Sequence, residues 1–266
     1  NVDIAYGFPF RGDRVDIAVV TERLEQRIRV FSLPDMAPLD DGDLIVFNGD
    51  TERAPMGIAL YKRPIDQTFF IFIGGKSGPA EGYIGQYKLE EDLKQDKLKI
   101  TPVREFGKYS GKKEIEAIAV DTDAGYVYYS DETAGVRKYH ADPDVPDANR
   151  ELALFANEGF TRDHEGISIY ELNEQKGYIL VSDQQANQFK IYNREGSPGN
   201  PHDHRLVKII EVEAIESDGS EVTSIPLSPA FPSGLFVAMS NGKTFHYYSW
   251  DDIAGKDLRK KTTTIK

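Results

Sequence analysis

Two glutamates stand in front of strand-like runs in the same register. Glu116 lies in "EIEAIAVD" and Glu165 lies in "DHEGISIY", and in each stretch a small residue follows the glutamate before an apolar run. Asp3 and Asp218 hold corresponding places in two further segments of the chain. Carboxylate oxygens suit hard cations, and Ca²⁺ accepts about six to eight of them in loose geometry. The chain has no cysteine, which excludes thiolate metal sites. The residues therefore indicate a hard cation, and the loose geometry favours calcium before magnesium.

A second set of polar residues ends the strand that follows. "GYVYYSDE" (residues 125–132) aligns without a gap on "GYILVSDQ" (residues 177–184), and "FIFIGGK", "IAVVTER" and "GLFVAMSN" fit the same register. The final residues of these runs are Arg23, Lys76, Glu132, Gln184 and Asn241. Basic side chains next to a metal ion would bind an anion, and phosphate is the natural candidate.

A carboxylate at a strand start is usually a solvated edge charge or a turn former. For a single residue that interpretation is the better one, because Asp and Glu are mostly exposed. Four carboxylates in one repeat register are harder to explain in this way. Like charges that approach each other closely repel unless a cation neutralises them.

The elements that must position these residues are short strands separated by turns. Helical periodicity is nearly absent, apart from a short helix predicted over residues 250–258. The strand pairs recur at intervals of about 40 to 50 residues, a period typical of propeller blades. We therefore predict an all-β fold, a β-propeller with five blade units of four antiparallel strands, in a single domain over residues 1–266.

In such a blade the first strand lines the central channel and the second runs antiparallel to it. The start of strand one and the end of strand two then share one face. The predicted strand starts are Asp3, Met56, Glu116, Glu165 and Asp218. We expect these starts and the strand ends to meet at one rim of the channel.

The composition limits the classes of function. The chain has 266 residues and a net charge of −12, so it repels nucleic acid and anionic membranes and suits cations. No apolar run reaches the length of about 20 residues that spans a bilayer. The "PHDH" segment offers His202 and His204, but without a third ligand we interpret it as a solvated loop.

These segments resemble the β-propeller phytases of bacteria, calcium-dependent alkaline phosphatases that act on inositol hexakisphosphate. The resemblance runs through nearly the whole chain and is carried by "NVDIAYGFP", "GGKSGPAEGYIGQYKL", "EAIAVDTDAGYVYYSDE", "DHEGISIYELNEQKGYILVSDQ" and "SPAFPSGLFVA". The family has six blades, so an N-terminal blade would be missing from these residues. Met56 replaces a substrate-contacting tyrosine of the family, and Ser77 replaces a frequent glutamate.

The resemblance implies a role for each residue of the two sets. Calcium ligands would be Asp3, Glu116, Asp163, Glu165, Gln184 and Asp218. Arg23 and Lys76 would contact phosphate, and Glu132 would be an acidic site residue, so that the catalytic set is Arg23, Lys76 and Glu132. In the family, bridging Ca²⁺ ions polarise a phosphate and supply an activated water for in-line attack.

The resemblance thus implies a calcium-dependent phosphoric monoester hydrolase acting on phytate, of the 3-phytase type. It also implies a secreted or periplasmic bacterial monomer that binds neither nucleic acid nor membrane. Two alternatives stay open. One is a non-catalytic phytase-like propeller that binds calcium and phosphate, and the other is a plain interaction propeller, which would leave the graded charge of the rim unexplained.

Overall fold

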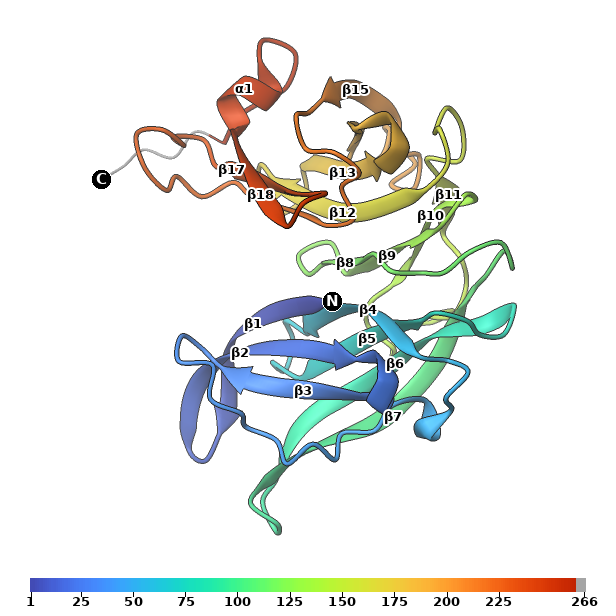
Figure 1. Ribbon diagram of the computed structural model, residues 1–266, viewed down its shortest axis with the longest axis vertical. Helices are drawn as coiled ribbons and strands as arrows, with labels where there is room; N and C mark the ends of the chain where they lie inside the picture. Colours follow the sequence, from blue (N-terminus) through green and yellow to red (C-terminus); the bar gives the residue numbers. More distant parts are fainter. Residues whose placement is uncertain (262–266) are drawn as a thin grey trace. The chain divides into compact units, whose positions relative to one another are not determined.

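The computed structural model describes residues 1–261, and the chain is an all-β protein of the β-propeller class. Five antiparallel sheets follow one another along the sequence, as the repeat predicts (Figure 1). The chain divides into two compact units. The first contains residues 1–127 and 139–151, and the second contains residues 128–138 and those from 152 onward.

Each sheet begins with a strand pair in the predicted register. The first strands are β1 (Val2–Phe10), β4 (Pro55–Lys62), β8 (Ile118–Asp121), β12 (His164–Glu171) and β16 (Ser220–Thr223). The second strands are β2 (Asp13–Glu22), β5 (Phe69–Gly75), β9 (Tyr126–Asp131), β13 (Gly177–Asp183) and β17 (Leu235–Ser240). These second strands contain the five runs that align without a gap.

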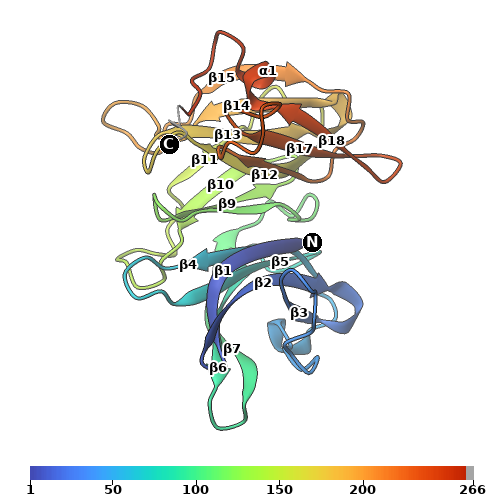
Figure 2. The same ribbon diagram turned by 90° about the vertical axis from the view of Figure 1, so that its left-hand side faces the viewer.

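Third strands are present in all five sheets and fourth strands in three. The third strands are β3 (Arg27–Ser32), β6 (Glu81–Asp92), β10 (Gly135–His140), β14 (Gln188–Asn193) and β18 (Thr244–Ser249). The fourth strands are β7 (Lys97–Lys108), β11 (Ala153–Phe155) and β15 (Leu206–Glu211). The strands β6 and β7 form the longest hairpin, which extends well beyond β4 and β5 (Figure 2).

The first sheet, β1–β3, differs from the four-stranded prediction, and its fourth position is filled by irregular chain. Residues 37–46 run beside β3, where Leu39 donates its N–H to Val30 O at 2.8 Å and Ile28 donates to Leu44 O at 3.0 Å. A regular ladder is interrupted because Pro38 has no N–H and because the Asp40 carboxylate takes the Val30 N–H at 2.7 Å. The last sheet, β16–β18, also has three strands.

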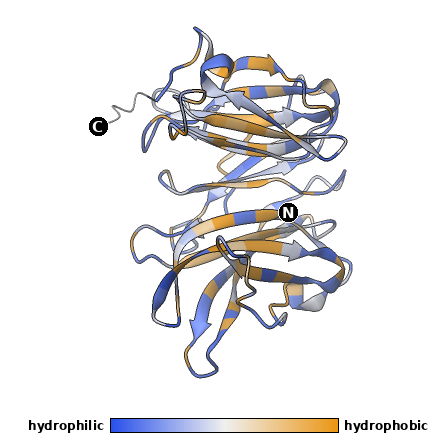
Figure 3. Ribbon diagram, turned by 60° about the vertical axis from the view of Figure 1, so that its left-hand side comes forward, coloured by the Kyte–Doolittle hydropathy of each residue, from blue (hydrophilic) through white to orange (hydrophobic). Residues whose placement is uncertain are grey.

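Apolar residues alternate with polar ones along many strands (Figure 3), and buried apolar side chains build a core in each unit. In the first unit, the core joins the β1–β3 sheet to the β4–β7 sheet through residues such as Phe8, Val19, Ile71 and Leu89. In the second unit, the core joins β12–β15 to β16–β18. The residues of β5 and β13 are buried on both faces, which explains why these strands are apolar runs with little alternation.

Short helices connect several strands. The 3₁₀ turns η1 (Arg23–Glu25) and η3 (Gln184–Ala186) follow β2 and β13, and each is followed by a left-handed residue, Gln26 or Asn187. A third such turn is η2 (Phe47–Gly49).

The α-helix α1 (Trp250–Ala254) starts where the sequence predicts, with Ser249 Oγ capping the Asp251 N–H at 3.3 Å. It ends four residues before the predicted end at Leu258, since Gly255 adopts a positive φ of 56°. No helix within residues 1–261 is long and apolar enough to cross a membrane.

Candidate functional site

The second set of residues occupies one position of the repeat. Arg23, Lys76, Glu132, Gln184 and Asn241 are each the first residue after the second strand of their sheet. The first set is less uniform. Asp3 and Glu165 are the second residues of β1 and β12, Asp163 directly precedes β12, and Glu116 and Asp218 lie two residues before β8 and β16.

Within a sheet, the two sets lie at the same end. Lys76 donates its N–H to Ala54 O, just before β4, at 2.9 Å. Gln184 donates its N–H to Asp163 O, just before β12, at 3.3 Å. These bonds follow from antiparallel pairing, which brings the start of one strand to the end of its partner.

At two of the strand-start positions, the glycine that follows has a steric cause. A Cβ on Gly57 would lie 2.3 Å from Glu116 O, and a Cβ on Gly166 would lie 2.8 Å from Ser220 N. First strands of neighbouring sheets therefore approach each other backbone to backbone in each unit, and a side chain at these positions would force them apart.

Hydroxyl groups join neighbouring sheets beside the site. Thr21 donates to Met56 O at 2.9 Å, Ser130 to Glu165 O at 3.2 Å and Ser182 to Ser217 O at 2.9 Å. Each donor lies two residues before a strand-end residue, and each acceptor lies at or near the start of the next sheet. The hydroxyls thus fix the backbone that carries the first set.

In the first unit, the Asp3 carboxylate points to the neighbouring first strand. It accepts the Ile4 N–H at 2.7 Å and the Leu60 N–H of β4 at 2.6 Å. Burial raises the pKa of the Asp3 carboxyl above its usual value, although both backbone bonds lower it. A cation would oppose the effect of burial, so this residue fits a metal ligand.

The basic residues of the first unit that we expect to bind phosphate lie on turns. Arg23 starts η1, and Lys76 follows β5 with its Nζ 3.6 Å from Glu114 Oε1. The Lys76 turn needs glycine, because a Cβ on Gly75 would lie 2.4 Å from Arg53 O and one on Gly78 would lie 2.9 Å from the Tyr83 ring. The half-exposed Lys76 ammonium is accessible to an anion from solvent.

In the second unit, carboxylates and amides take the corresponding positions. Glu132, Asp163 and Glu165 are buried, whereas Asp218 is exposed and bonded by the Gln184 amide. A buried carboxylate is costly without a hydrogen bond or a cation. The oxygen-rich donor set is the kind that calcium prefers.

No group of three or more His, Asp or Glu side chains within residues 1–261 is gathered as a metal cage. Two of the expected ligands bond to other groups, Asp218 to the Gln184 amide and Asp3 to the Leu60 N–H. The assignment of all six residues to calcium therefore stays a prediction.

Two contacts near the predicted site residues were not predicted from the sequence. Gln185, the neighbour of Gln184, bonds Asp163, and its only signal in the sequence is its place directly after a strand-end residue. Lys190 and Asp183 form a buried ion pair at 3.1 Å that supports the loop before β12.

His204 corrects the interpretation of "PHDH" as a solvated loop. Its side chain is buried, with Nδ1 2.8 Å from Asn193 O and Nε2 3.1 Å from the buried Lys138 Nζ. Burial, and then the charge of Lys138, lower the pKa of His204 to about 4. The packing of the second unit therefore explains this histidine without a metal.

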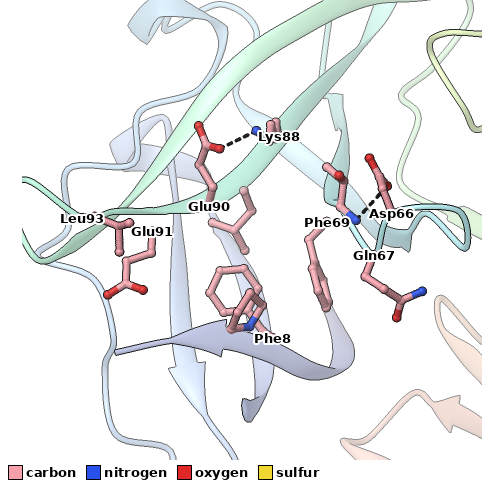
Figure 4. A pocket seen from close by; sticks show the side chains of 11 residues that line it. Phe8, Asp66, Gln67, Phe69, Lys88, Glu90, Glu91 and Leu93 are labelled. Atoms are coloured by element: carbon pink, nitrogen blue, oxygen red, sulfur yellow. Dashed lines mark hydrogen bonds and ion pairs between the residues drawn. The ribbon is translucent and has the colours of Figure 1, made fainter. Parts of the chain in front are cut away.

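A shallow pocket of about 290 Å³ lies elsewhere on the first unit (Figure 4). Its floor is apolar, with Phe8 and Phe69, and Lys88 and Glu90 at its side are paired with each other at 2.5 Å. It contains none of the predicted site residues.

Known proteins resemble the chain over most of its length. A "3-phytase" of Bacillus subtilis (strain 168) is 27% identical over 277 residues, which cover 96% of this chain and 68% of that protein. A putative exo-beta-1,3-galactanase from Bifidobacterium bifidum s17 superposes with a TM-score of 0.51 at 14% identity, covering 98% of this chain and 91% of that one. Raptor of Chaetomium thermophilum gives a TM-score of 0.55 at 10% identity, covering 98% of this chain and 21% of that one.

The two solved structures share the fold alone. The family comparison is more specific, because the phytase family matches residues 1–259 and so includes every strand and both sets of site residues. The chain is a hydrolase, and it belongs to the phytase family.

Proposed function

We propose that the chain is a calcium-dependent phosphoric monoester hydrolase that acts on phytate. The observation that carries the proposal is the common repeat position of Arg23, Lys76, Glu132 and Gln184 in a chain of the phytase family. The similarity to a 3-phytase supports phytate as the substrate.

The calcium ligands we propose are Asp3, Glu116, Asp163, Glu165, Gln184 and Asp218. The raised pKa of Asp3 and the burial of Asp163 and Glu165 support this assignment, since a cation would compensate these desolvated carboxylates. Calcium, when bound, polarises a phosphoryl oxygen and lowers the pKa of a coordinated water.

Arg23 and Lys76 would hold the phosphate oxygens. An ammonium or guanidinium donates charge-assisted hydrogen bonds, which are about twice as strong as neutral ones. Glu132 would act as the acidic group of the site, and its burial suits a residue of fixed orientation. We further propose a secreted or periplasmic monomer without nucleic-acid or membrane partners, in line with the net charge of −12.

The decisive measurement is the release of phosphate from phytate with calcium and with excess chelator. We expect turnover that requires calcium and a melting temperature that rises with calcium. At a hundredfold excess over the dissociation constant, the native state gains about 2.7 kcal/mol.

The rival function is a non-catalytic propeller that binds calcium and phosphate. Met56 and Ser77, which replace family residues, favour it. A chain that melts higher in calcium, binds phosphate and releases none from phytate supports this rival. A melting curve that does not change up to millimolar calcium contradicts both functions.

A further inference from the structure

Gln185 forms two hydrogen bonds with Asp163. Its side-chain Oε1 accepts the Asp163 backbone N–H at 2.9 Å, and its Nε2 donates to Asp163 Oδ2 at 2.8 Å. One amide thus fixes both the backbone and the carboxylate of the residue that leads into β12. A carboxylate held in this way keeps few orientations.

The same amide continues to a second carboxylate. Gln185 Nε2 also donates to Gln184 Oε1, and Gln184 Nε2 donates to Asp218 Oδ1. A series of two amides therefore connects Asp163 and Asp218, which precede the first strands of two sheets in the second unit. The donors also offset the negative charge at both ends of the series.

Equivalent positions of the repeat do not make this contact. In η1, the residue that corresponds to Gln185 is Leu24, whose surface is 86% exposed. After β5 the corresponding residue is Ser77, whose hydroxyl bonds the backbone oxygen of Glu52. Of these three residues, Gln185 alone bonds a carboxylate, so the repeat frame does not require the contact.

We propose that Gln185 is a positioning residue for the calcium site, and that it holds Asp163 and, through Gln184, Asp218 in the orientation that binds the ion. The proposal rests on the proposed function. A ligand that is already oriented loses less conformational entropy when the ion binds. Residues that orient metal ligands typically change metal affinity about 10- to 100-fold when they are replaced.

The test is calcium titration of the whole chain by calorimetry, with Gln185→Met as the main variant. Methionine keeps the length of the side chain and removes both hydrogen bonds to Asp163. We expect the calcium dissociation constant to rise about 10- to 100-fold. The matched control is Gln175→Met, the same change at an exposed turn residue of the second unit, which should bind calcium as the parent does.

A second variant separates the two bonds. Gln185→Glu keeps an acceptor for the Asp163 N–H but loses the donor to the carboxylate, so it should also weaken calcium binding. Melting in chelator verifies that each variant is folded, and Gln185→Asn replaces Gln185→Met if the latter does not fold. With saturating calcium, kcat on phytate should return to the parental value, because the ligands themselves are intact.

Equal affinity of Gln185→Met and Gln175→Met, within twofold, overturns the positioning role while the proposed function stands. Normal affinity in Gln185→Glu overturns the contribution of the bond to the carboxylate. If the parent chain binds no calcium, the proposed function fails and the positioning role fails with it, and the parental titration alone identifies that case.

Discussion

The two units differ in how many charged side chains they bury. Of the described residues, the first unit buries Asp40, Arg53 and Asp121 and builds its core from aliphatic and aromatic side chains. The second unit buries many more ionisable groups, namely Asp131, Glu132, Arg137, Lys138, Asp163, His164, Glu165, Asp183, Lys190, Arg194 and His204. Both units use the same strand repeat, so the repeat does not decide which chemistry its interior holds.

Pairing is what makes the burial of charge possible in the second unit. Arg137 Nε lies 2.8 Å from Asp131 Oδ2, and Lys190 Nζ lies 3.1 Å from Asp183 Oδ2. Such pairs are weak evidence of stability, but the removal of one partner leaves a charge buried alone. The second unit should therefore depend on its ion pairs and on pH, and the first unit much less.

The largest expected effect is on the Lys190–Asp183 pair. Lys190→Met removes the ammonium and leaves Asp183 buried, which should lower the free energy of unfolding of the second unit by about 3 to 5 kcal/mol. Lys97→Met, in the first unit, removes a partly exposed partner of Asp43 and should cost at most about 1 kcal/mol. Hydrogen exchange of peptides from each unit measures both effects.

Adding Asp183→Asn to Lys190→Met should restore part of the stability, since no carboxylate then stays buried without its partner. Similar losses in Lys190→Met and Lys97→Met would remove the distinction between the units.

Acid should destabilise the second unit. His204 is neutral in the folded state, where its pKa is about 4, and it titrates near 6.5 when the chain is unfolded. Below pH 6.5 the unfolded state binds the proton first, so stability falls as the pH falls from 6.5 to about 4. The total loss is about 3 kcal/mol, from 1.36 kcal/mol for each pKa unit.

Hydrogen exchange at several pH values between 7 and 4, after correction for the intrinsic rate, tests this expectation. The loss should appear in peptides of the second unit and be smaller in His204→Asn. An equal acid response of both units would contradict the comparison.

The smallest expected effect separates the role of a phosphate-binding cation, Lys76 of the first unit, from that of a calcium-binding carboxylate, Glu165 of the second unit, in the proposed reaction. Lys76→Ala removes a charge-assisted contact worth about 1.5 to 3 kcal/mol, so phosphate release should fall roughly 10- to 100-fold. The rise of the melting temperature in calcium should persist. Glu165→Ala should lose both, because a carboxylate ligand is gone. An equal loss of the calcium response in both variants would show that the roles are wrongly assigned.

The strand pairs and the position of the site residues could be predicted from the sequence. The ungapped register of the second strands places Lys76, Glu132 and Gln184 directly after them, as the structure has them. The irregular chain beside β3 could not be predicted, because Pro38 and Asp40 replace ladder bonds by local ones and leave no period-two pattern. The helix α1 is shorter than predicted because Gly255 adopts a positive φ, which ends the helix before Leu258.

The finer contacts of the site depend on tertiary structure. The hydrogen bond between the Asp3 carboxylate and the Leu60 N–H joins residues 57 positions apart. The local sequence around either residue does not predict it. The contact of Gln185 with Asp163 could not be predicted either, since a glutamine on a turn is usually solvated. The buried His204 appeared in the sequence as part of a polar loop, and only its packing against Lys138 reveals otherwise.

The close approach of neighbouring strands at Gly57 and Gly166 affects which substitutions the repeat can accept. These positions exclude a side chain, whereas the residue just before them is methionine in one sheet, at Met56, and glutamate in another, at Glu165. Single substitutions at the tolerant position therefore exchange an apolar group for a carboxylate while the neighbouring glycine preserves the spacing of the strands. Chemical diversity in this fold can therefore arise at one position of the repeat, beside glycine positions that have no room for a side chain.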